Sequence, residues 1–194
     1  MLGIDPGTRR TGFAVFMTRN GVVECLRIDT IVLPERWSLP RRLALLGQEI
    51  QSVLEEYRPS EISIEQAIYA QNVRTALALG QARGVILFAS MSEGREIYEY
   101  SPREVKRAVT GSGNASKHQV QRMIERLVGG GREFGSDEAD AAAIALCHLM
   151  RPQTLNTQEK EPTLLAGRQG TRQRTGSRWT PADIERLQKE GRVL

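Results

Sequence analysis

The sequence of 194 residues predicts an α/β protein in which short buried strands alternate with amphipathic helices. Two patterns predict this class: short apolar runs that end in turn residues, typical of strands, and apolar residues that recur at spacings of three and four, typical of helices. Hydrophobic residues make up 40% of the chain and charged residues 26%, as in globular proteins. The length suits one domain of ordinary size with an appendage.

The first strands are predicted at the N-terminus. The apolar run Leu2–Ile4 ends in Asp5, and Pro6-Gly7 turns the chain, which indicates a buried strand with an acid at its end. Asp5 by itself is explained equally well as a turn cap, because Asp often caps turns. Two further β-rich runs flank the hairpin signal Asn20-Gly21, so three consecutive antiparallel strands are expected. These runs cover residues 11–17 and 22–33.

Helices alternate with two more strands up to residue 150. The second of the acid-ended strands closes with Glu65, just as the first closes with Asp5. Ser101 precedes Pro102 as a helix cap, and Ser136 is expected to cap the last helix, which is rich in alanine. The expected strands are 62–65 and 96–100, and the expected helices are 43–57, 72–92, 116–128, 137–150 and one that begins at 102.

Charge divides the chain into a neutral part and a basic tail. Residues 1–150 hold 18 Lys and Arg and 18 Asp and Glu, whereas residues 151–194 hold 9 and 5. We therefore expect a folded domain at 1–150 and a disordered basic tail at 151–194, with a short helix near 180–190 that Thr180 caps. The tail either attracts phosphate, since residues 162–178 contain four arginines and no acid, or only keeps the protein soluble.

The cysteines and the hydropathy pattern bear on the compartment. Cys25 and Cys147 lie in apolar segments, where a free thiol behaves as a small hydrophobe, so a structural disulfide is not expected. No apolar run approaches the ~20 residues that span a bilayer, and no signal segment is recognisable. The expectation is a soluble protein of the reducing cytoplasm without a membrane partner.

The acids give the chemistry. Asp5 and Glu65 close two strands, and Asp137 and Asp140 lie three residues apart on one face of a helix, whereas Glu138 between them points to the surface. If the strands are neighbours and the alanines pack the helix on them, four carboxylates converge. Oxygen ligands without a Cys or His cluster favour Mg²⁺ or Mn²⁺. Two such ions roughly 3.5–4 Å apart would activate water and stabilise the leaving oxygen in displacement at phosphate.

Several motifs together resemble those of RuvC-type Holliday-junction resolvases, in the same order, over about residues 1–150. The glycine turn alone is not specific, because actin-like ATPases and sugar kinases carry a similar phrase. The motifs are Gly3-Ile-Asp-Pro-Gly-Thr-Arg-Arg-Thr-Gly-Phe13, Ile64-Glu-Gln66, Leu79-Gly-Gln-Ala-Arg-Gly84, Val105-Lys106, Lys117-His-Gln-Val-Gln121 and Asp137-Glu-Ala-Asp-Ala141.

The resemblance implies an RNase H-like fold, a five-stranded mixed sheet flanked by helices, in a symmetric homodimer. It implies paired nicks across four-way DNA junctions in recombination and repair, and a branch-migration helicase complex that presents the junction. A twofold helix contact fits the small residues and apolar face of 79–88. By matching position, the metal ligands and catalytic residues are Asp5, Glu65, Asp137 and Asp140.

The resemblance also implies DNA contacts. Lys106 and Lys117 match lysines that engage DNA near the scissile phosphate, and Arg122 lies on the basic helix that Lys117 begins. Where the family's pattern calls for an aromatic wedge at the junction centre, this sequence has Ile68 followed by Tyr69, and either can unstack bases.

Three other functions compete with the resolvase. An actin-like ATPase needs a duplicated domain, for which the chain is too short, and a catalytically inactive junction scaffold does not need all four acids. A related RNase H-like nuclease that acts on RNA or on other branched DNA is harder to separate, because the acids set the reaction and not the substrate.

Overall fold

The computed structural model describes residues 1–66, 72–92, 94–128 and 132–151. The predicted tail at 151–194, apart from Arg151, and the predicted wedge residues Ile68 and Tyr69 lie outside this part of the chain. The fold described below is therefore that of the domain predicted at residues 1–150. None of the helices in the described segments is both long enough and apolar enough to cross a membrane.

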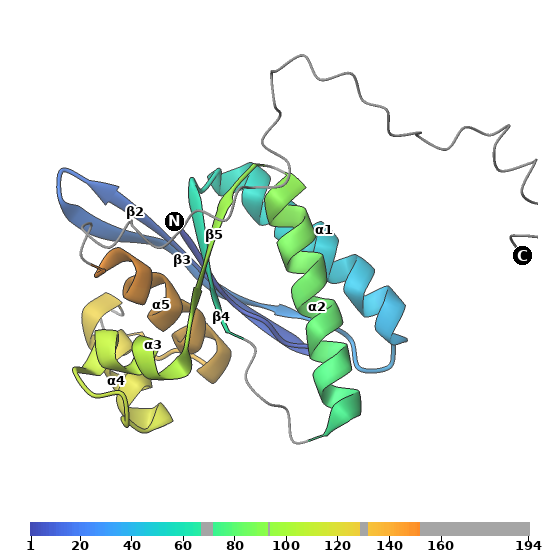
Figure 1. The fold of residues 1–194 in the computed structure, drawn as a ribbon. Coiled ribbons are helices and arrows are strands. Elements are labelled where there is room, and N and C mark those ends of the chain that lie inside the picture. Colours follow the sequence, from blue (N-terminus) through green and yellow to red (C-terminus); the bar gives the residue numbers. More distant parts are fainter. Residues whose placement is uncertain (67–71, 93, 129–131, 152–194) are drawn as a thin grey trace, which may run out of the picture. The chain divides into compact units, whose positions relative to one another are not determined.

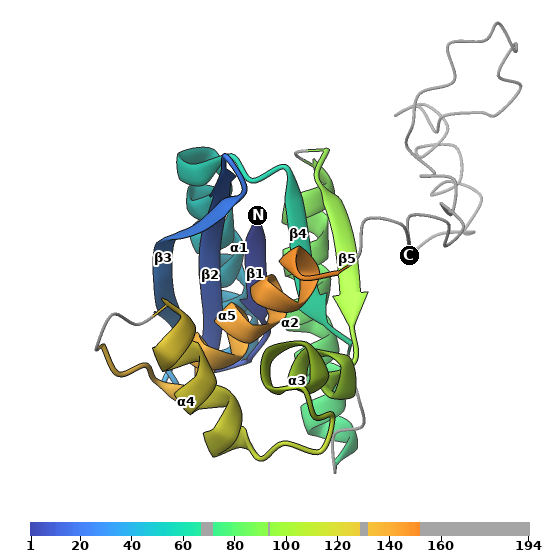
Figure 2. The same ribbon diagram turned by 90° about the vertical axis from the view of Figure 1, so that its left-hand side faces the viewer.

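A mixed sheet of five strands forms the centre of the fold, in the order β3-β2-β1-β4-β5 (Figure 2). Strand β2 runs antiparallel to both β1 and β3, whereas β1, β4 and β5 are parallel to one another. The five-stranded mixed sheet that was predicted is thus confirmed. The strands are β1 (Leu2–Asp5), β2 (Arg10–Arg19), β3 (Val22–Val32), β4 (Glu61–Glu65) and β5 (Glu96–Tyr100).

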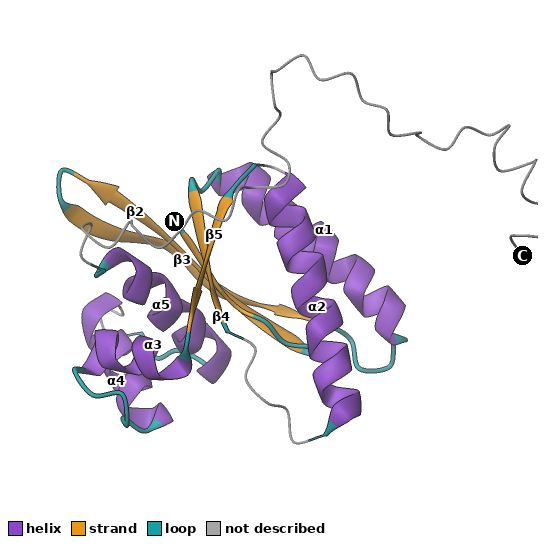
Figure 3. Ribbon diagram, viewed as in Figure 1, coloured by secondary structure: helices purple, strands orange, loops and turns teal. Residues whose placement is uncertain are grey.

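Helices cover both faces of the sheet (Figures 1 and 3). One face carries α1 and α2, and the other carries α3, α4 and α5, with α5 lying directly across β1 and β2. Each face has its own apolar core. The helices are α1 (Leu39–Tyr57), α2 (Val73–Ser92), α3 (Pro102–Thr110), α4 (Lys117–Val128) and α5 (Ser136–Leu149).

The helix starts follow local capping chemistry, with two departures from expectation. Ser101 caps α3 as predicted: its hydroxyl accepts the Glu104 amide, and Glu104 accepts the Ser101 amide in return. Helix α1 starts four residues earlier than predicted, at Leu39, because Pro40 fits the first turn of a helix. Helix α5 is preceded by Gly135 and not capped by Ser136, which already belongs to the helix.

Glu138 corrects a second expectation about α5. The residue was expected at the surface, but its side chain is only 16% exposed. Its Oε2 accepts the Gly135 amide at 2.8 Å, and Arg132 lies 3.5 Å from the other oxygen. Glu138 therefore closes the first turn of α5 from within, the position where an acid is favoured by the helix dipole.

Period-two alternation places the two sides of the central strands. Leu2, Ile4, Ile62 and Ile64 are fully buried against α1 and α2. The residues between them are small and face α5, where the Ser63 hydroxyl donates to the carbonyl of Ile144 at 3.3 Å. Small side chains on this face let a helix lie unusually close to the sheet.

Two glycines make that close approach of α5 possible. A Cβ at Gly3 would lie 2.5 Å from the carbonyl oxygen of Ala141, and one at Gly12 would lie 1.9 Å from the carbonyl oxygen of Asp137. Both obstacles are backbone atoms, which cannot turn aside as a flexible side chain can. The start of α5, which carries two aspartates in its first two turns, thus sits on the sheet because these positions have no side chain.

We expect Gly12→Ala to be strongly destabilising for this reason. The added methyl group must displace the start of α5, at a cost of about 3 kcal/mol in the free energy of unfolding, toward the upper end for overpacked cores. Urea denaturation followed by circular dichroism measures it. Gln48→Ala is the control, because it also introduces alanine, at an exposed position of helix α1, and alanine favours a helix. Equal stability of Gly12→Ala and the wild type would contradict this account.

The two cysteines differ in exposure, and the histidine near the end of α5 is buried. Cys25, expected to behave as a buried hydrophobe, is exposed on the edge strand β3, whereas Cys147 is buried. His148, near the end of α5, is 3% exposed, and burial lowers its pKa against the opposing effect of Glu61. Its ring nitrogens pair with the Tyr100 hydroxyl at 2.8 Å and with Glu61 at 3.1 Å.

Candidate metal centre

Asp5 and Glu65 lie side by side at one edge of the sheet. Their strands are parallel neighbours, paired as Leu2 with Ile62 and Ile4 with Ile64, so the residues that follow both pairs end their strands together. The condition set out from the sequence, that these two strands adjoin, is met. Carboxyl ends of parallel strands form the usual place for a site in such folds.

Helix α5 supplies the other two acids. Asp137 and Asp140 occupy its first two turns, and the contact of Asp137 with Gly12 sets this end of the helix against β2, opposite Asp5 in the β1–β2 register. The first turn is also where the helix dipole favours negative charge. We refer to Asp5, Glu65, Asp137 and Asp140 together as the four-acid site.

The pKa of Asp5 reports how closely the charges are gathered. Burial raises it from 3.8 to about 7, and the charges of Asp140, Glu65 and Asp137 add to the rise. Burial and the charge of Asp140 also raise the pKa of Glu65. Carboxylates that raise one another's pKa values form a donor set suited to a hard divalent cation, which would remove the repulsion.

Two basic side chains balance part of this charge. The Nε of Arg10 lies 2.6 Å from Oδ2 of Asp137, and the Nζ of Lys117 lies 2.8 Å from Oδ2 of Asp140. Burial acts to lower the pKa of Lys117, but its hydrogen bond to Asp140 and the nearby acids outweigh burial and raise it. Each aspartate of α5 thus faces a cation.

Besides burial, the charges of the other three acids raise the pKa of Asp5, but the four side chains do not surround a single point. Among the described residues, no three Asp, Glu, His or Cys side chains lie close enough to hold one metal ion. The ion pairs with Arg10 and Lys117 explain this, because they direct Asp137 and Asp140 toward nitrogen atoms. A cation that enters must compete with these two side chains.

The remaining predicted DNA contacts lie at different distances from the four acids. Lys106 on α3 is close enough for its charge to lower the pKa of Glu65 against the net rise, which puts it beside the β4 end. Arg122 is exposed and lines a cavity of about 490 Å³ between α3 and α4, together with Arg126 and Gln119. Ile68 and Tyr69, the predicted wedge residues, lie outside the described residues.

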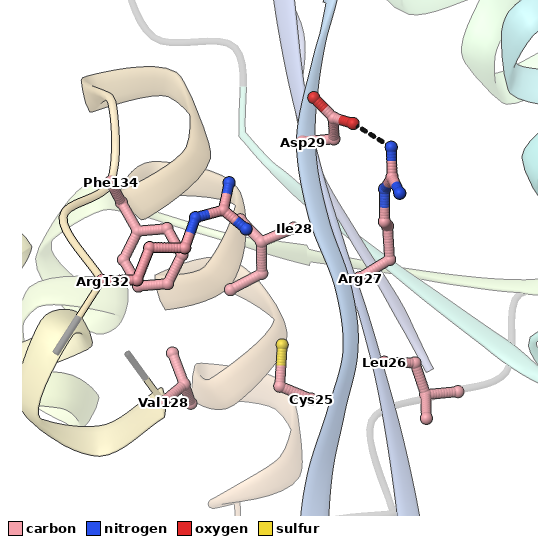
Figure 4. A pocket seen from close by; sticks show the side chains of 8 residues that line it. All are labelled: Cys25, Leu26, Arg27, Ile28, Asp29, Val128, Arg132 and Phe134. Atoms are coloured by element: carbon pink, nitrogen blue, oxygen red, sulfur yellow. Dashed lines mark hydrogen bonds and ion pairs between the residues drawn. The ribbon is translucent and has the colours of Figure 1, made fainter. Parts of the chain in front are cut away.

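A second cavity, of about 530 Å³, lies beside the edge strand and apart from the four acids (Figure 4). The ring of Phe134 and the guanidinium of Arg132 stack at 5.1 Å, and Cys25 points toward them from β3. None of the residues predicted to form the site lines this cavity. Its position gives it no part in the chemistry of the carboxylates.

Three arginines that were not predicted as site residues contact the four-acid site or the backbone beside it. Arg10 pairs with Asp137, Arg42 of α1 donates to the carbonyl of Thr8 in the turn after Asp5, and Arg83 of α2 donates to the carbonyl of Glu65. Arg10 lies only five residues after Asp5, and Arg83 lies in the motif 79–84, so their positions in the sequence could have marked both as candidates. Their partners could not be recognised in this way, because the partners come from distant parts of the chain.

The family model for the crossover junction endodeoxyribonuclease RuvC matches residues 1–148. The chain belongs to the RuvC family. Relatives of this name in Syntrophomonas wolfei and Moorella thermoacetica are 40% and 43% identical over 150 and 149 residues. These matches span 77% and 76% of this chain, and 87% and 89% of the respective relatives.

Solved RuvC structures agree with the fold. The RuvC of Thermus thermophilus is 28% identical, with a TM-score of 0.69 over 77% of this chain and 94% of that chain. The same protein in complex with a Holliday junction substrate gives a TM-score of 0.71 over 77% and 92%. The yeast mitochondrial resolvase Ydc2, at 18% identity and a TM-score of 0.58, shares the fold.

Membership of the RuvC family settles the class of reaction and of substrate. The protein is a metal-dependent endodeoxyribonuclease that resolves Holliday junctions, with the RNase H-like fold that the motifs implied. The ATPase alternative fails on this ground, as does a nuclease for RNA. The four-acid site lies within the matched residues and offers the donors that such a nuclease needs.

Proposed function

We propose that Asp5, Glu65, Asp137 and Asp140 are the catalytic residues and hold two divalent cations, Mg²⁺ or Mn²⁺. The observation that carries this proposal is geometric: the parallel ends of β1 and β4 and the start of α5 bring the four acids together, and the charges of the other three add to the rise that burial causes in the pKa of Asp5. Such repulsion is costly in the absence of a compensating charge and is relieved by a cation. The ions supply Lewis-acid activation of water and stabilisation of the leaving oxygen.

The chain itself does the positioning. The parallel ends of β1 and β4 hold Asp5 and Glu65 in a fixed relation, and α5 presents its two aspartates from a helix that cannot slide because the glycines lock it on the sheet. Arg10 and Lys117 neutralise Asp137 and Asp140 until cations enter. Lys117 is then free to meet a phosphate oxygen near the scissile bond, as a compact point charge does well.

The other proposed DNA contacts flank this centre. Lys106, beside Glu65, and Arg122, on α4, present positive charge on the α3–α4 side of the four-acid site. We assign the junction wedge to the segment after Glu65, to Ile68 or Tyr69. A wedge there would open the junction centre next to the strand end that carries Glu65.

We infer a homodimer from the exposed face of α2. Val73, Leu77 and Phe88 are 76%, 65% and 76% exposed, and they follow one stripe of the helix with Met91. Gly80 and Gly84 lie on the same stripe with open space around them, which allows a second helix to approach closely. An apolar stripe of this size rarely stays in contact with water, and two like copies place two sites symmetrically for paired nicks.

Phe88→Asp is expected to break that dimer. A carboxylate buried in an apolar contact without a partner is costly, so the dissociation constant should rise roughly a hundredfold or more. Sedimentation equilibrium measures it, and the paired nicks should become single, uncoordinated ones. Glu55→Asp on the neighbouring helix α1 is the control, since it keeps an exposed acid. A dimer of undiminished affinity in Phe88→Asp would rule out the α2 face.

The family also supports a larger partner. We propose that a branch-migration helicase complex presents the junction to the dimer, as the resemblance implied. A pull-down of purified helicase components on immobilised junction, with and without this protein, tests the partnership. Independent binding of the two to the junction, without mutual enrichment, would oppose it.

Cleavage of a synthetic mobile four-way junction, compared with a linear duplex of the same sequence, tests the proposed chemistry. We expect paired nicks in the junction in Mg²⁺ or Mn²⁺, none in EDTA, and little attack on the duplex. Titration of each metal gives the preferred ion, and a rate that depends on the square of metal concentration at low metal indicates two ions. A first-power dependence throughout would leave a single ion.

A further inference from the structure

Arg83 lies where helix α2 meets the ends of two strands. Its side chain is only 12% exposed, which is unusual for an arginine. Nη1 donates a hydrogen bond to the main-chain carbonyl of Glu65, the last residue of β4. Nη2 pairs at 2.6 Å with Glu99 of β5. One guanidinium therefore joins α2 to both strands.

The peptide unit after Glu65 is held at both of its ends. Arg83 binds its carbonyl oxygen, and the amide nitrogen of the same unit, which belongs to Gln66, donates to the carbonyl of Tyr100 at 2.8 Å. A peptide group is planar, so fixing its oxygen and its nitrogen fixes the backbone dihedral ψ of Glu65. The direction in which the Glu65 side chain leaves the strand is fixed with it.

Packing alone does not account for Arg83. Ala82 and Ile86 bury the neighbouring turns of α2 in the apolar core with α1, without help from a charge. The partner Glu99 is 47% exposed, and an ion pair with such a group adds little stability. The strong part of the arrangement is the charged hydrogen bond to a backbone carbonyl, and that carbonyl belongs to one of the four acids.

We propose that Arg83 is a positioning residue for Glu65, which it holds in the orientation that a metal ion requires. The inference rests on the proposed role of Glu65 as a metal ligand. Helix α2 carries both Arg83 and the proposed dimer face, so the two proposals concern the same element. Loss of an outer partner of a metal ligand typically costs 10- to 100-fold in metal affinity or activity.

The test compares Arg83→Met, which keeps the aliphatic stem, with Arg83→Lys and the wild type. Thermal unfolding of the full-length protein without DNA is followed at increasing Mn²⁺ concentration, and the midpoint of the metal-induced stabilisation is measured. We expect the midpoint to rise about tenfold in Arg83→Met and about threefold in Arg83→Lys, because an amine holds fewer partners than a guanidinium. Junction affinity in EDTA should stay within twofold of the wild type.

Arg58→Met is the matched control, an exposed arginine removed from the far end of α1. A role limited to folding would lower the melting temperature of Arg83→Met and leave its metal midpoint within twofold of the control, which would overturn the proposal. Should the methionine variant not fold, an unchanged midpoint in Arg83→Lys has the same force.

Glu65→Gln, measured in parallel, separates this proposal from the one it rests on. A wild-type metal response and wild-type cleavage in Glu65→Gln would remove Glu65 from the metal site, and Arg83 would lose its proposed task as well. Loss of the response in Glu65→Gln, with a wild-type midpoint in Arg83→Met, would overturn the role of Arg83 alone.

Discussion

Asp5→Asn should abolish junction cleavage, lowering the rate by roughly a thousandfold or more, because loss of a central charged ligand removes stabilisation that exists only in the transition state. Junction affinity in EDTA should stay within a fewfold of the wild type, since the substitution removes negative charge. Single-turnover cleavage in Mg²⁺ and a binding isotherm in EDTA measure the two. Glu133→Gln, an exposed acid ahead of α5, is the control.

The same substitution should stabilise the metal-free protein. The pKa of Asp5 is about 7 in the folded protein and near 3.8 unfolded, so the folded state binds the proton more tightly. Stability from this group is therefore present at low pH and is lost as the pH rises through 7, by roughly 1 kcal/mol between pH 6 and pH 8. Asp5→Asn lacks this loss, so its advantage in melting temperature should be larger at pH 8.

Two outcomes would count against this account of Asp5. Cleavage by Asp5→Asn at the wild-type rate would remove Asp5 from the chemistry. A metal-free melting temperature that drops in Asp5→Asn at pH 8 would mean that the ionised carboxylate stabilises the fold, contrary to its raised pKa.

Lys117→Met should slow cleavage about a hundredfold, the cost of removing one charge that stabilises a phosphoryl transition state. The loss should appear in the single-turnover rate at saturating metal and junction, with the junction dissociation constant changed less than about threefold, because one phosphate contact contributes little to total affinity. Arg107→Met on α3 removes an exposed cation and serves as control.

Lys117→Met should also change the metal concentration at which the protein is half-stabilised. The ammonium that faces Asp140 at 2.8 Å is gone, so a cation no longer has to displace it. We expect a lower metal midpoint in thermal unfolding together with the slower cleavage. A variant that cleaves slowly only because it binds metal poorly would contradict the proposed role, and excess metal would then restore its rate.

The sequence allowed the centre of the site to be predicted because strand ends are locally marked. Apolar runs that stop at an acid placed Asp5 and Glu65 at strand ends without knowledge of their neighbours. The last helix was placed on them through its alanines, and the sheet order confirms that β1 and β4 adjoin. The periodicity of apolar residues was enough to predict the position of a residue where that position depends only on the residue's own strand or helix.

Contacts of long side chains could not be predicted in this way. Arg10, Arg42 and Arg83 reach backbone or acid partners that other elements bring within range, and nothing local distinguishes them from solvated arginines. The burial of His148 could not be predicted for a similar reason, because it depends on Tyr98 and Tyr100 of β5, whose rings lie 4.5 and 5.8 Å from it.

The strand acids and the helix acids of the four-acid site are far apart in the sequence, and this separation affects how the site forms during folding. Arg10 and Asp137, which touch, are 127 residues apart in sequence, and α5 is the last element of the described fold. Contacts of such long range form late in folding, and a chain emerging from the ribosome holds only two of its acids until α5 has been made. A chain that ends before α5 therefore lacks Asp137 and Asp140 and cannot assemble the four-acid site.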